Sequence, residues 1–324
     1  MVSERWLALD HLTLALLRLR EDHLPARPLH DTDLLPRPRG RWGRSSLQNL
    51  VRAHVENLVP AAGCTPLVVA DHAGDVVGDV AAEFPPVWPP VDPAGAAAKL
   101  RAWARHLDER SRRSVAPRRR GPTAPEPGDL GYAVLRCYDA VDRTPARLVV
   151  HVVSDVPPSA CPSAAGWVGG LPLDARRDGV VVTVLDLPRH SDEAHSDEAV
   201  CSMVRAHGRE PLVLDLGTTE SPHMEITAVL ERVLAQTSAL RDGSATASPS
   251  PGRVTPEVRW PVIMLRTPAG WGSPHVPRDR DDRCDLTGPP TLDPVDLPRL
   301  ENWSRSHRPR ASFLHEDVPV EPAR

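Results

Sequence analysis

The most regular part of the sequence alternates short apolar runs with amphipathic stretches. Runs rich in valine and leucine are typical of buried strands, and apolar residues three or four positions apart are typical of helices. The predicted strands are 147–155, 179–187, 210–217 and 258–267, and the predicted helices are 130–141, 196–208 and 222–241. Strands that alternate with helices pair in parallel and are covered on both faces. We therefore expect an α/β fold, a parallel sheet with helices on both faces.

The N-terminal part adds two helices and one strand to this pattern. Residues 5–21 place leucines at helical spacing, which predicts a helix facing the core: Leu9, Leu12, Leu16 and Leu19. Residues 45–59 predict a second helix, with Ser45 or Ser46 as its N-cap. A short apolar strand begins the stretch 65–78, and another helical stretch covers 94–111.

Composition shifts along the chain predict one domain over 1–324 with four parts. Residues 1–83 hold the N-terminal helices and the first strand, and residues 84–127 are rich in proline and arginine. Residues 128–274 hold the main α/β sheet with a flexible linker at 242–257, and residues 275–324 form a C-terminal extension.

Charge and cysteine content narrow the class of protein. The 39 basic and 43 acidic residues nearly balance, which argues against nucleic acid or an anionic membrane as a partner. No apolar run reaches the roughly 18 to 20 residues of a membrane span, so we expect a cytoplasmic protein. The five scattered cysteines form no C-x-x-C pair, so we expect reduced thiols and neither a disulfide framework nor a zinc site.

Two polar segments offer weak sites. The arginine-rich run 112–120 has the chemistry to clamp a phosphate, although a solvated loop is the favoured interpretation. The duplicated decamer HSDEAHSDEA at 190–199 holds two histidines and four acidic residues, a possible metal set. Histidines five positions apart do not share a helix face, so a solvated segment is again favoured.

Six segments in order carry a resemblance to one family. They are RWGRSSLQNLVRAH (41–54), GDLGY (128–132), RRDGVVVTVLDL (176–187), AHGREPLVLDLG (206–217), RWPVIMLRTPAGWGSP (259–274) and LENWSRSHRP (300–309). They resemble HWGTTPGLNFIYAH, GELGY, ARDGAVLPILHL, GYGYEPYFVEGD, RWPMIVLRTPKGWTGP and LEEWLRSYRP-like segments of the phosphoketolases that act on xylulose 5-phosphate and fructose 6-phosphate. The resemblance implies a thiamine-diphosphate-binding fold of the diphosphate-domain type. It also implies that the family's pyrimidine-binding and C-terminal domains are absent from this chain.

The family's reaction sets the expected cofactors. Phosphoketolases use thiamine diphosphate and Mg²⁺ to cleave a ketose phosphate with inorganic phosphate into acetyl phosphate and a shorter aldose phosphate. Their metal-binding motif, VVGDGEAETGPLATAW, falls without gaps on VVSDVPPSACPSAAGW at 152–167. By this resemblance Asp155 matches the metal-binding aspartate, whereas Ser154 and Val156 replace two glycines that let the backbone approach the diphosphate.

Other cofactor positions are replaced as well. The family's glutamate after GDG falls on Pro157, and its second metal ligand, an asparagine, falls on Pro188, which has no side-chain oxygen for Mg²⁺. Gly131, in GDLGY, keeps a family residue beside the cofactor. Only one of the two protein metal ligands therefore remains.

The family's histidines, which can supply protons and hydrogen bonds to a sugar phosphate, are also missing. The HWG histidine falls on Arg41, the GPGHGG histidine falls on Gly74, and the SIHEGG histidine has no counterpart. No catalytic residue is therefore assigned. Residues that set backbone paths or fill the core still match: Trp42, Gly43, Asn49, Gly131, Tyr132, Trp167, Asp178, Gly179, Arg259, Trp260, Pro261, Leu265, Arg266, Gly270 and Trp271.

Three functions follow. The first is a phosphoketolase-like protein that is catalytically impaired or inactive, in which Asp155 caps the next segment as an N-cap. The second is the diphosphate-binding subunit of a split thiamine diphosphate enzyme, completed by a separate chain with a pyrimidine-binding domain. The third is a binder of another phosphate ligand, with Asp71, Asp75, Asp155, Arg41 and Arg44 as candidate contacts.

The partners follow from the same resemblance. The family buries a large face of this domain against other domains and subunits, and an exposed apolar face needs a partner. We therefore expect a homodimer or a heteromer with a pyrimidine-domain chain. A sugar phosphate is expected as substrate only if the protein is active.

Overall fold

A computed structural model describes much of the chain. The described residues are 2–20, 29–35, 45–70, 98, 101–102, 104–105, 130–153, 177–189, 197–241, 259–268, 271–272 and 297–307. The chain divides into two compact units. The first comprises Met1–Asn49, Gly74–Pro122 and Gly272–Arg324, and the second comprises Leu50–Ala73 and Thr123–Trp271.

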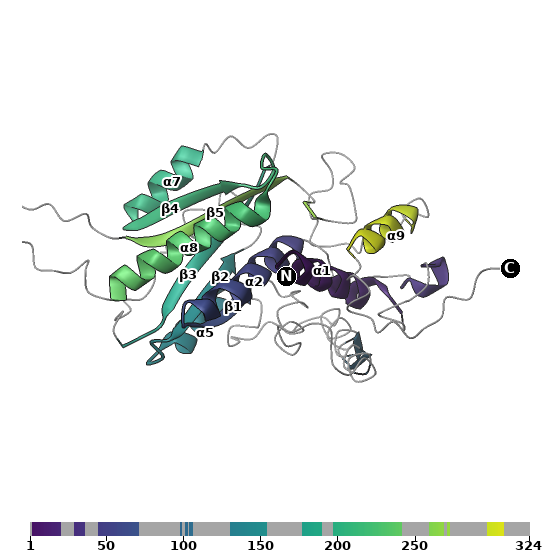
Figure 1. Ribbon diagram of the computed structural model, residues 1–324, viewed down its shortest axis with the longest axis horizontal. Helices are drawn as coiled ribbons and strands as arrows, with labels where there is room; N and C mark the ends of the chain where they lie inside the picture. Colours follow the sequence, from purple (N-terminus) through teal and green to yellow (C-terminus); the bar gives the residue numbers. More distant parts are fainter. Residues whose placement is uncertain are drawn as a thin grey trace, which may run out of the picture. The chain divides into compact units, whose positions relative to one another are not determined.

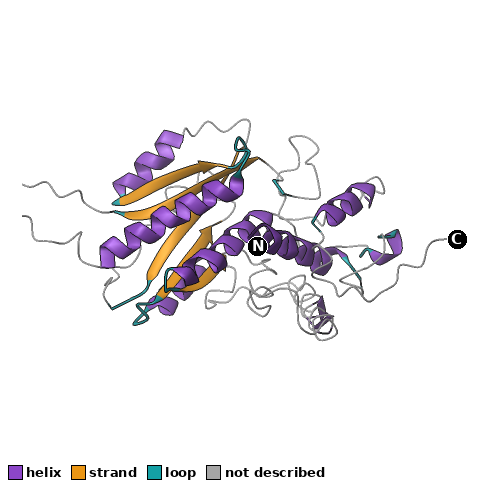
Figure 2. Cartoon of the chain, in the orientation of Figure 1, coloured by secondary structure: helices purple, strands orange, loops and turns teal. Residues whose placement is uncertain are grey.

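The second unit is built on a five-stranded parallel sheet (Figures 1 and 2). Its strands are β1 (Thr65–Ala70), β2 (Arg147–Val153), β3 (Val180–Arg189), β4 (Arg209–Asp215) and β5 (Trp260–Pro268). They lie in the order β1-β2-β3-β5-β4, and every neighbouring pair is parallel. The predicted parallel α/β fold is confirmed.

Helices cover both faces of this sheet. Helix α5 (Leu130–Val141) packs Cys137 and Val141 against Val149 of β2. Helix α7 (Asp197–Ala206) packs on the same face, because Val204 meets Val153, which lies on the Val149 side of β2. Helix α8 (Pro222–Arg241) follows β4, from which the chain steps back to β5, so a right-handed crossover puts it on the opposite face. Figure 1 shows α8 lying across the front of the strands.

The turn before β3 explains two residues that match the family. Asp178 is buried and its Oδ1 accepts the backbone N–H of Arg143, 3.1 Å away, where Arg143 has a φ of 52°. A Cβ on Gly179 would lie 2.4 Å from the carbonyl oxygen of Arg147. The backbones therefore approach too closely for any side chain at this position. Asp178 and Gly179 serve the fold.

The predicted element bounds differ from the observed ones in detail. Strand β3 runs to Arg189, two residues beyond the predicted end, and includes Pro188. At Pro188 the strand pairs only with β5 among the described strands, because its pairing with β2 stops at Leu185, so the missing N–H breaks no ladder on the β2 side. The predicted linker 242–257 and both proposed loop sites, 112–120 and 190–196 of the decamer, lie outside the described residues.

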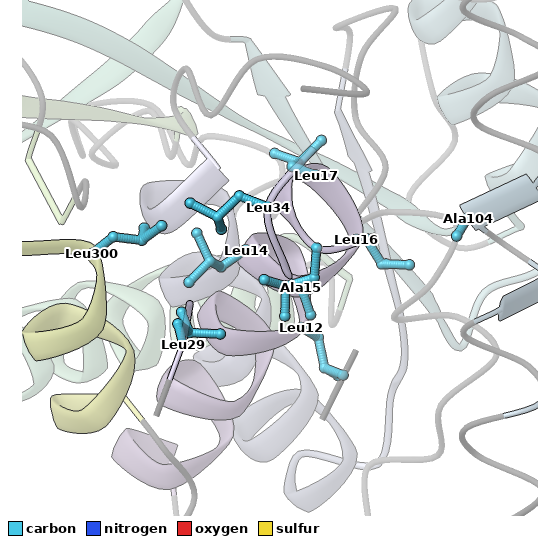
Figure 3. Close-up of a cluster of buried hydrophobic side chains, with 10 residues drawn as sticks. Leu12, Leu14, Ala15, Leu16, Leu17, Leu29, Leu34, Ala104 and Leu300 are labelled. Carbon is cyan, nitrogen blue, oxygen red and sulfur yellow. The ribbon is translucent and has the colours of Figure 1, made fainter. Parts of the chain in front are cut away.

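The first unit is formed by helices. It holds α1 (Val2–Arg18), a 3₁₀ turn η1 (Asp31–Asp33), the first turn of α2 (Ser45–Ala61) and α9 (Leu297–Ser306). Its core is a leucine cluster (Figure 3): Leu12, Leu14, Ala15, Leu16, Leu17, Leu19, Leu29, Leu34, Ala104 and Leu300. The predicted core-facing helix is confirmed. It is buried on more sides than its leucine stripe indicated, since Asp10, His11 and Thr13 are buried too.

Helix α9 was not predicted as a helix, because the sequence placed it in a C-terminal extension. It contributes Leu300, which is 1% exposed, to the leucine cluster of the first unit. In Figure 3, Leu300 reaches this cluster from its own helix, on the same side as Leu14 and Leu29. Among the described residues, no helix is long and apolar enough to cross a membrane.

Candidate functional site

The carboxyl ends of the five parallel strands meet at one edge of the sheet, where α/β folds bind ligands. Strand β2 ends at Val153, directly before the expected metal-binding segment, and its neighbour β3 ends at Arg189. The loop after β4 is fixed at the same edge, because the N–H of Leu216 donates to the carbonyl oxygen of Arg266 at 2.8 Å.

The structure places few of the predicted site residues. Gly131 lies in the first turn of α5, and Pro188 lies near the end of β3, in register with Thr267 of β5. The other predicted positions lie outside the described residues: Arg41, Arg44, Asp71, Gly74, Asp75, Ser154, Asp155, Val156 and Pro157. Pro188 therefore lies at the carboxyl edge of the sheet beside β5, and a proline side chain has no oxygen ligand.

Buried polar side chains at this edge escaped the sequence analysis. Asp186 of β3 and Thr267 of β5 are each 0% exposed. Asp186 lies on the same side of β3 as Val184 and Val182, the α8 side of the sheet. The apolar run around it hid this buried polar residue from the sequence analysis. A polar residue inside an otherwise continuous apolar strand is the signal that could have found it.

Side chains near the start of α8 form hydrogen bonds within the same segment. The hydroxyl of Thr219 donates to the Glu225 carboxylate and accepts the backbone N–H of Ser221 at 3.1 Å. The carbonyl oxygen of Ser221 then accepts the N–H of Met224 at 3.0 Å. Part of the donor capacity of this helix start is thus used within the protein.

A pair of histidines joins α2 to the first two turns of α8. Nε2 of His54 lies 3.0 Å from Nδ1 of His223, and Nδ1 of His54 lies 3.2 Å from Oγ1 of Thr227. The Thr227 hydroxyl also donates to the carbonyl oxygen of His223 at 2.8 Å. His54 is 1% exposed. The pair is built from residues 169 positions apart, which a sequence pattern does not reveal.

The hydrogen bonds fix the tautomers of this pair. A carbonyl oxygen only accepts, so the single proton of the Thr227 hydroxyl is committed to the His223 carbonyl. His54 must then donate from Nδ1 to Thr227, and its Nε2 accepts from Nδ1–H of His223. Nε2 is consequently the unprotonated nitrogen of the His223 ring. The order Thr227, His54, His223 is a directed relay of hydrogen bonds.

Both histidines are held neutral. Burial, with the neighbouring His223 as a second cause, lowers the pKa of His54 to about 4. Burial also lowers the pKa of His223. At neutral pH the pair therefore carries no charge of its own to attract a phosphate.

The relay is built for a proton rather than for a metal. The ring centroids are 5.2 Å apart, longer than the N···N distance by about one ring diameter, so the two nitrogens lie between the ring centres. The N–H of one ring faces the lone pair of the other, which suits an N–H···N bond, and the two nitrogens do not converge on a third point. The part of the chain that is described holds no group of three or more potential metal ligands.

Comparisons with known proteins identify the family. Residues 114–320 match the model of the XFP N-terminal domain. The chain is 30% identical over 350 residues to a probable phosphoketolase of Streptomyces avermitilis, covering 98% of this chain and 42% of the relative. It is 28% identical to a probable phosphoketolase of Streptomyces coelicolor and 26% identical to one of Rhodopseudomonas palustris, with 98% and 95% of this chain and 41% of each relative covered.

The match thus covers nearly the whole chain, and the chain spans about two fifths of the length of these relatives. The family-model match runs through β2, β3, β4 and β5 and through five of the six segments on which the resemblance rests. The chain belongs to the family of phosphoketolase N-terminal domains.

Proposed function

We propose that this chain is a phosphoketolase-like protein whose thiamine diphosphate site is impaired or inactive, so that its present role rests on the fold and on what it contacts. The feature that carries the proposal is Pro188, near the end of β3, which the resemblance aligns with the family's second metal ligand. Mg²⁺ requires hard oxygen ligands in near-octahedral geometry, which a proline side chain does not supply.

The residues around Asp155 support the same proposal. Ser154 and Val156 stand at the two glycine positions, and Pro157 and Pro158 remove backbone N–H donors that a phosphate needs. The residues present therefore do not fit thiamine diphosphate with Mg²⁺. The family's metal-dependent step is not assigned to this chain.

The residues near the edge offer an alternative chemistry of limited scope. The relay of Thr227, His54 and His223 is a neutral hydrogen-bonded group at the start of α8. It lacks the positive charge that a sugar phosphate or a diphosphate would need from its site. The relay accordingly supports the proposal that the thiamine diphosphate site is impaired, and it does not restore the family's activity.

An activity assay tests the proposal. The purified chain is incubated with xylulose 5-phosphate or fructose 6-phosphate, inorganic phosphate, thiamine diphosphate and Mg²⁺, and acetyl phosphate is measured. We expect none above the enzyme-free blank. Turnover that is lost in Asp155→Ala and kept in Asp142→Ala would overturn the proposal, since Asp142 is an exposed aspartate in the same unit. Turnover that needs a second polypeptide would favour the split enzyme.

We also propose a cytoplasmic protein that assembles with a second copy of itself or with another chain. Cys64, Cys137 and Cys201 form no disulfide, which supports a reducing compartment. Three large apolar side chains in the described part of the chain are exposed: Leu135, Val213 and Met224. Sedimentation at micromolar concentration tests assembly, and a single monomeric species would contradict it.

A further inference from the structure

A buried carboxyl group lies at the centre of the first unit. Asp10 of α1 is 0% exposed. Its Oδ2 accepts the Ser46 hydroxyl at 2.5 Å, and its Oδ1 accepts the Asn49 amide at 2.6 Å. Burial raises the pKa of Asp10 to about 7, although these two hydrogen bonds act in the opposite direction. Near neutral pH this side chain is therefore poised between its two protonation states.

The residue directly after α9, His307, lies next to this carboxyl group. Nε2 of His307 lies 3.9 Å from Oδ2 of Asp10. The His307 ring stacks on Trp303 with centroids 3.9 Å apart and meets the Trp6 ring edge-on at 6.0 Å. Two aromatic rings, one from each helix, thus hold the imidazole against α1.

The tautomer of His307 follows from its backbone contact. Nδ1 of His307 lies 3.0 Å from the carbonyl oxygen of Trp303, which can only accept, so Nδ1 carries the proton. Nε2 then carries the lone pair and faces Asp10. A carboxylate that faces a lone pair in a buried site is unfavourable, because both groups are acceptors and neither is solvated. One proton on either group removes this conflict.

Neighbouring hydrogen bonds join two other segments to this site, the start of α2 and the turn at Gly272. Trp6 donates from Nε1 to the carbonyl oxygen of Ser46 at 3.1 Å, and Trp303 donates from Nε1 to the carbonyl oxygen of Gly272 at 3.1 Å. A Cβ on Gly272 would lie 2.2 Å from the Ser46 hydroxyl oxygen, so the backbone itself packs against this group. We name Trp6, Asp10, Ser46, Trp303 and His307 the Asp–His clasp.

We propose that the Asp–His clasp is a pH-sensitive latch: α9 stays docked on α1 while Asp10 and His307 together hold one proton, and it is released when they lose it. Release would uncover Leu300, which is buried in the leucine cluster. The latch links the protonation of one buried pair to the attachment of the last described helix.

Other polar and charged groups lie on the elements that meet Asp10. Within the first unit, α2 presents the uncharged Ser46 and Asn49, and the turn at Gly272 presents backbone. His307, directly after α9, lies within ion-pair distance of Asp10, and Arg305 of α9 pairs with Glu301. The remaining charged or titratable side chains of α1 and α9 are Glu4, Arg5, His11, Arg18 and Arg299.

Proton linkage gives the expected pH profile. When α9 is released, Asp10 and His307 titrate near their ordinary values of about 3.9 and 6.5. Released and docked states then hold one proton each between about pH 4 and 6.5, so docking is insensitive to pH there. Above about pH 6.5 the released state loses its proton first. We expect the docking constant to fall about three- to tenfold between about pH 6.5 and 8.

Two variants should give pH profiles of α9 docking that differ in shape from that of the wild type. Asp10→Asn keeps the size of the side chain and removes its charge, and one amide oxygen replaces the two carboxylate oxygens that accept from Ser46 and Asn49. Burial lowers the pKa of His307, so docking in this variant should weaken only as the pH falls below about 6.5, the reverse of the wild type. His307→Phe keeps a ring against Trp303 and leaves Asp10 alone. Its docking should weaken about tenfold for each pH unit between about 4 and 7.

Hydrogen exchange of the full-length protein measures docking directly. Protection of backbone amides in 297–307 is followed from pH 4.5 to 8.5 and corrected for the intrinsic exchange rate, with peptides from β2 and α7 as internal controls. A fall in wild-type protection above about pH 6.5, reversed in Asp10→Asn, is the expected result. Parallel profiles of the wild type and Asp10→Asn, or a wild-type profile that is flat to pH 8.5, would overturn the latch. Asp10→Asn decides the question even if His307→Phe fails to dock.

Discussion

The interior of the parallel sheet and its carboxyl edge differ in how far their residues resemble those of the family. In the interior, Val149, Val150 and Met264 are 0% exposed, and the turn before β3 keeps the family's Asp178 and Gly179 in positions that the backbone demands. At the edge, Pro188 lies near the end of β3, and the resemblance aligns it with a metal ligand of the family. We expect packing to be kept while cofactor binding is lost.

The reason for the difference is energetic. A close-packed interior loses free energy with each methylene group removed, so a substitution there endangers the whole fold. A ligand-binding edge carries residues that serve a cofactor and add little to packing. The experiments below test this contrast by asking whether interior substitutions cost more than edge substitutions.

The largest effect is expected in the sheet interior. Leu265 of β5 is 1% exposed, and Leu265→Ala should lower the free energy of unfolding by about 2–5 kcal/mol through lost burial and a residual cavity. Urea denaturation measures it. Met224→Ala, at a side chain 73% exposed, is the control and should change stability by less than about 0.5 kcal/mol. Equal costs for the two substitutions would contradict the contrast.

The histidine relay should give the second unit a dependence on acid. The pKa of His54 in the folded protein is about 4, below its usual value, so its contribution to stability is present above about pH 6.5 and is lost as the pH falls through about 4. His54→Gln should reduce this loss in the free energy of unfolding by on the order of 2–3 kcal/mol. The measurement is the difference between wild-type and variant unfolding free energies from pH 7 to 4. His207→Gln, at an exposed histidine, is the control variant.

The backbone approach at Gly179 should cost less than a cavity. In Gly179→Ala the new methyl group would meet the carbonyl oxygens of Arg147 and Thr144 at 2.4 and 2.8 Å, which forces the turn to shift. We expect a loss of about 1–3 kcal/mol in urea denaturation. Gly208→Asn is the control, because Gly208 has a φ of 70°, which asparagine tolerates, and open space around its Cβ position. A loss at Gly208 as large as at Gly179 would mean that contacts are not the cause.

The smallest effect is expected at the carboxyl edge. Pro188→Asn restores the family's residue at the end of β3, where the strand has one described neighbour. We expect the free energy of unfolding to change by less than about 1 kcal/mol. A destabilisation comparable to that of Leu265→Ala would show that the proline is needed for the fold, and the edge would no longer differ from the interior.

The sheet could be predicted from the sequence because strands buried on both faces give uninterrupted apolar runs, as in 147–153 and 180–187. Helix α9 could not, because its charged segment carries few apolar residues, of which Leu300 alone is fully buried. The Asp–His clasp and the histidine relay were also missed. Each depends on partners distant in the chain, such as Asp10 with Ser46 and His54 with His223, and neither pair has a local pattern.

The expected cofactor site was predicted from a resemblance, and most of its residues lie outside those that the structure describes. Gly131 and Pro188 are the exceptions, and they lie in α5 and near the end of β3. The loss of binding at Ser154, Asp155 and Val156 stays a prediction. It depends on the chemistry of the side chains and needs a binding measurement.

The central claim is that the fold is kept and the cofactor site is lost, and calorimetric titration with thiamine diphosphate and Mg²⁺ tests it most directly. We expect no heat of binding for the wild type, and no stabilisation of the kind that a ligand at 100 times its dissociation constant gives, about 2.7 kcal/mol. A variant with Ser154→Gly, Val156→Gly, Pro157→Glu and Pro188→Asn serves as the restored comparison. Micromolar binding by the wild type that disappears in Asp155→Ala would contradict the account.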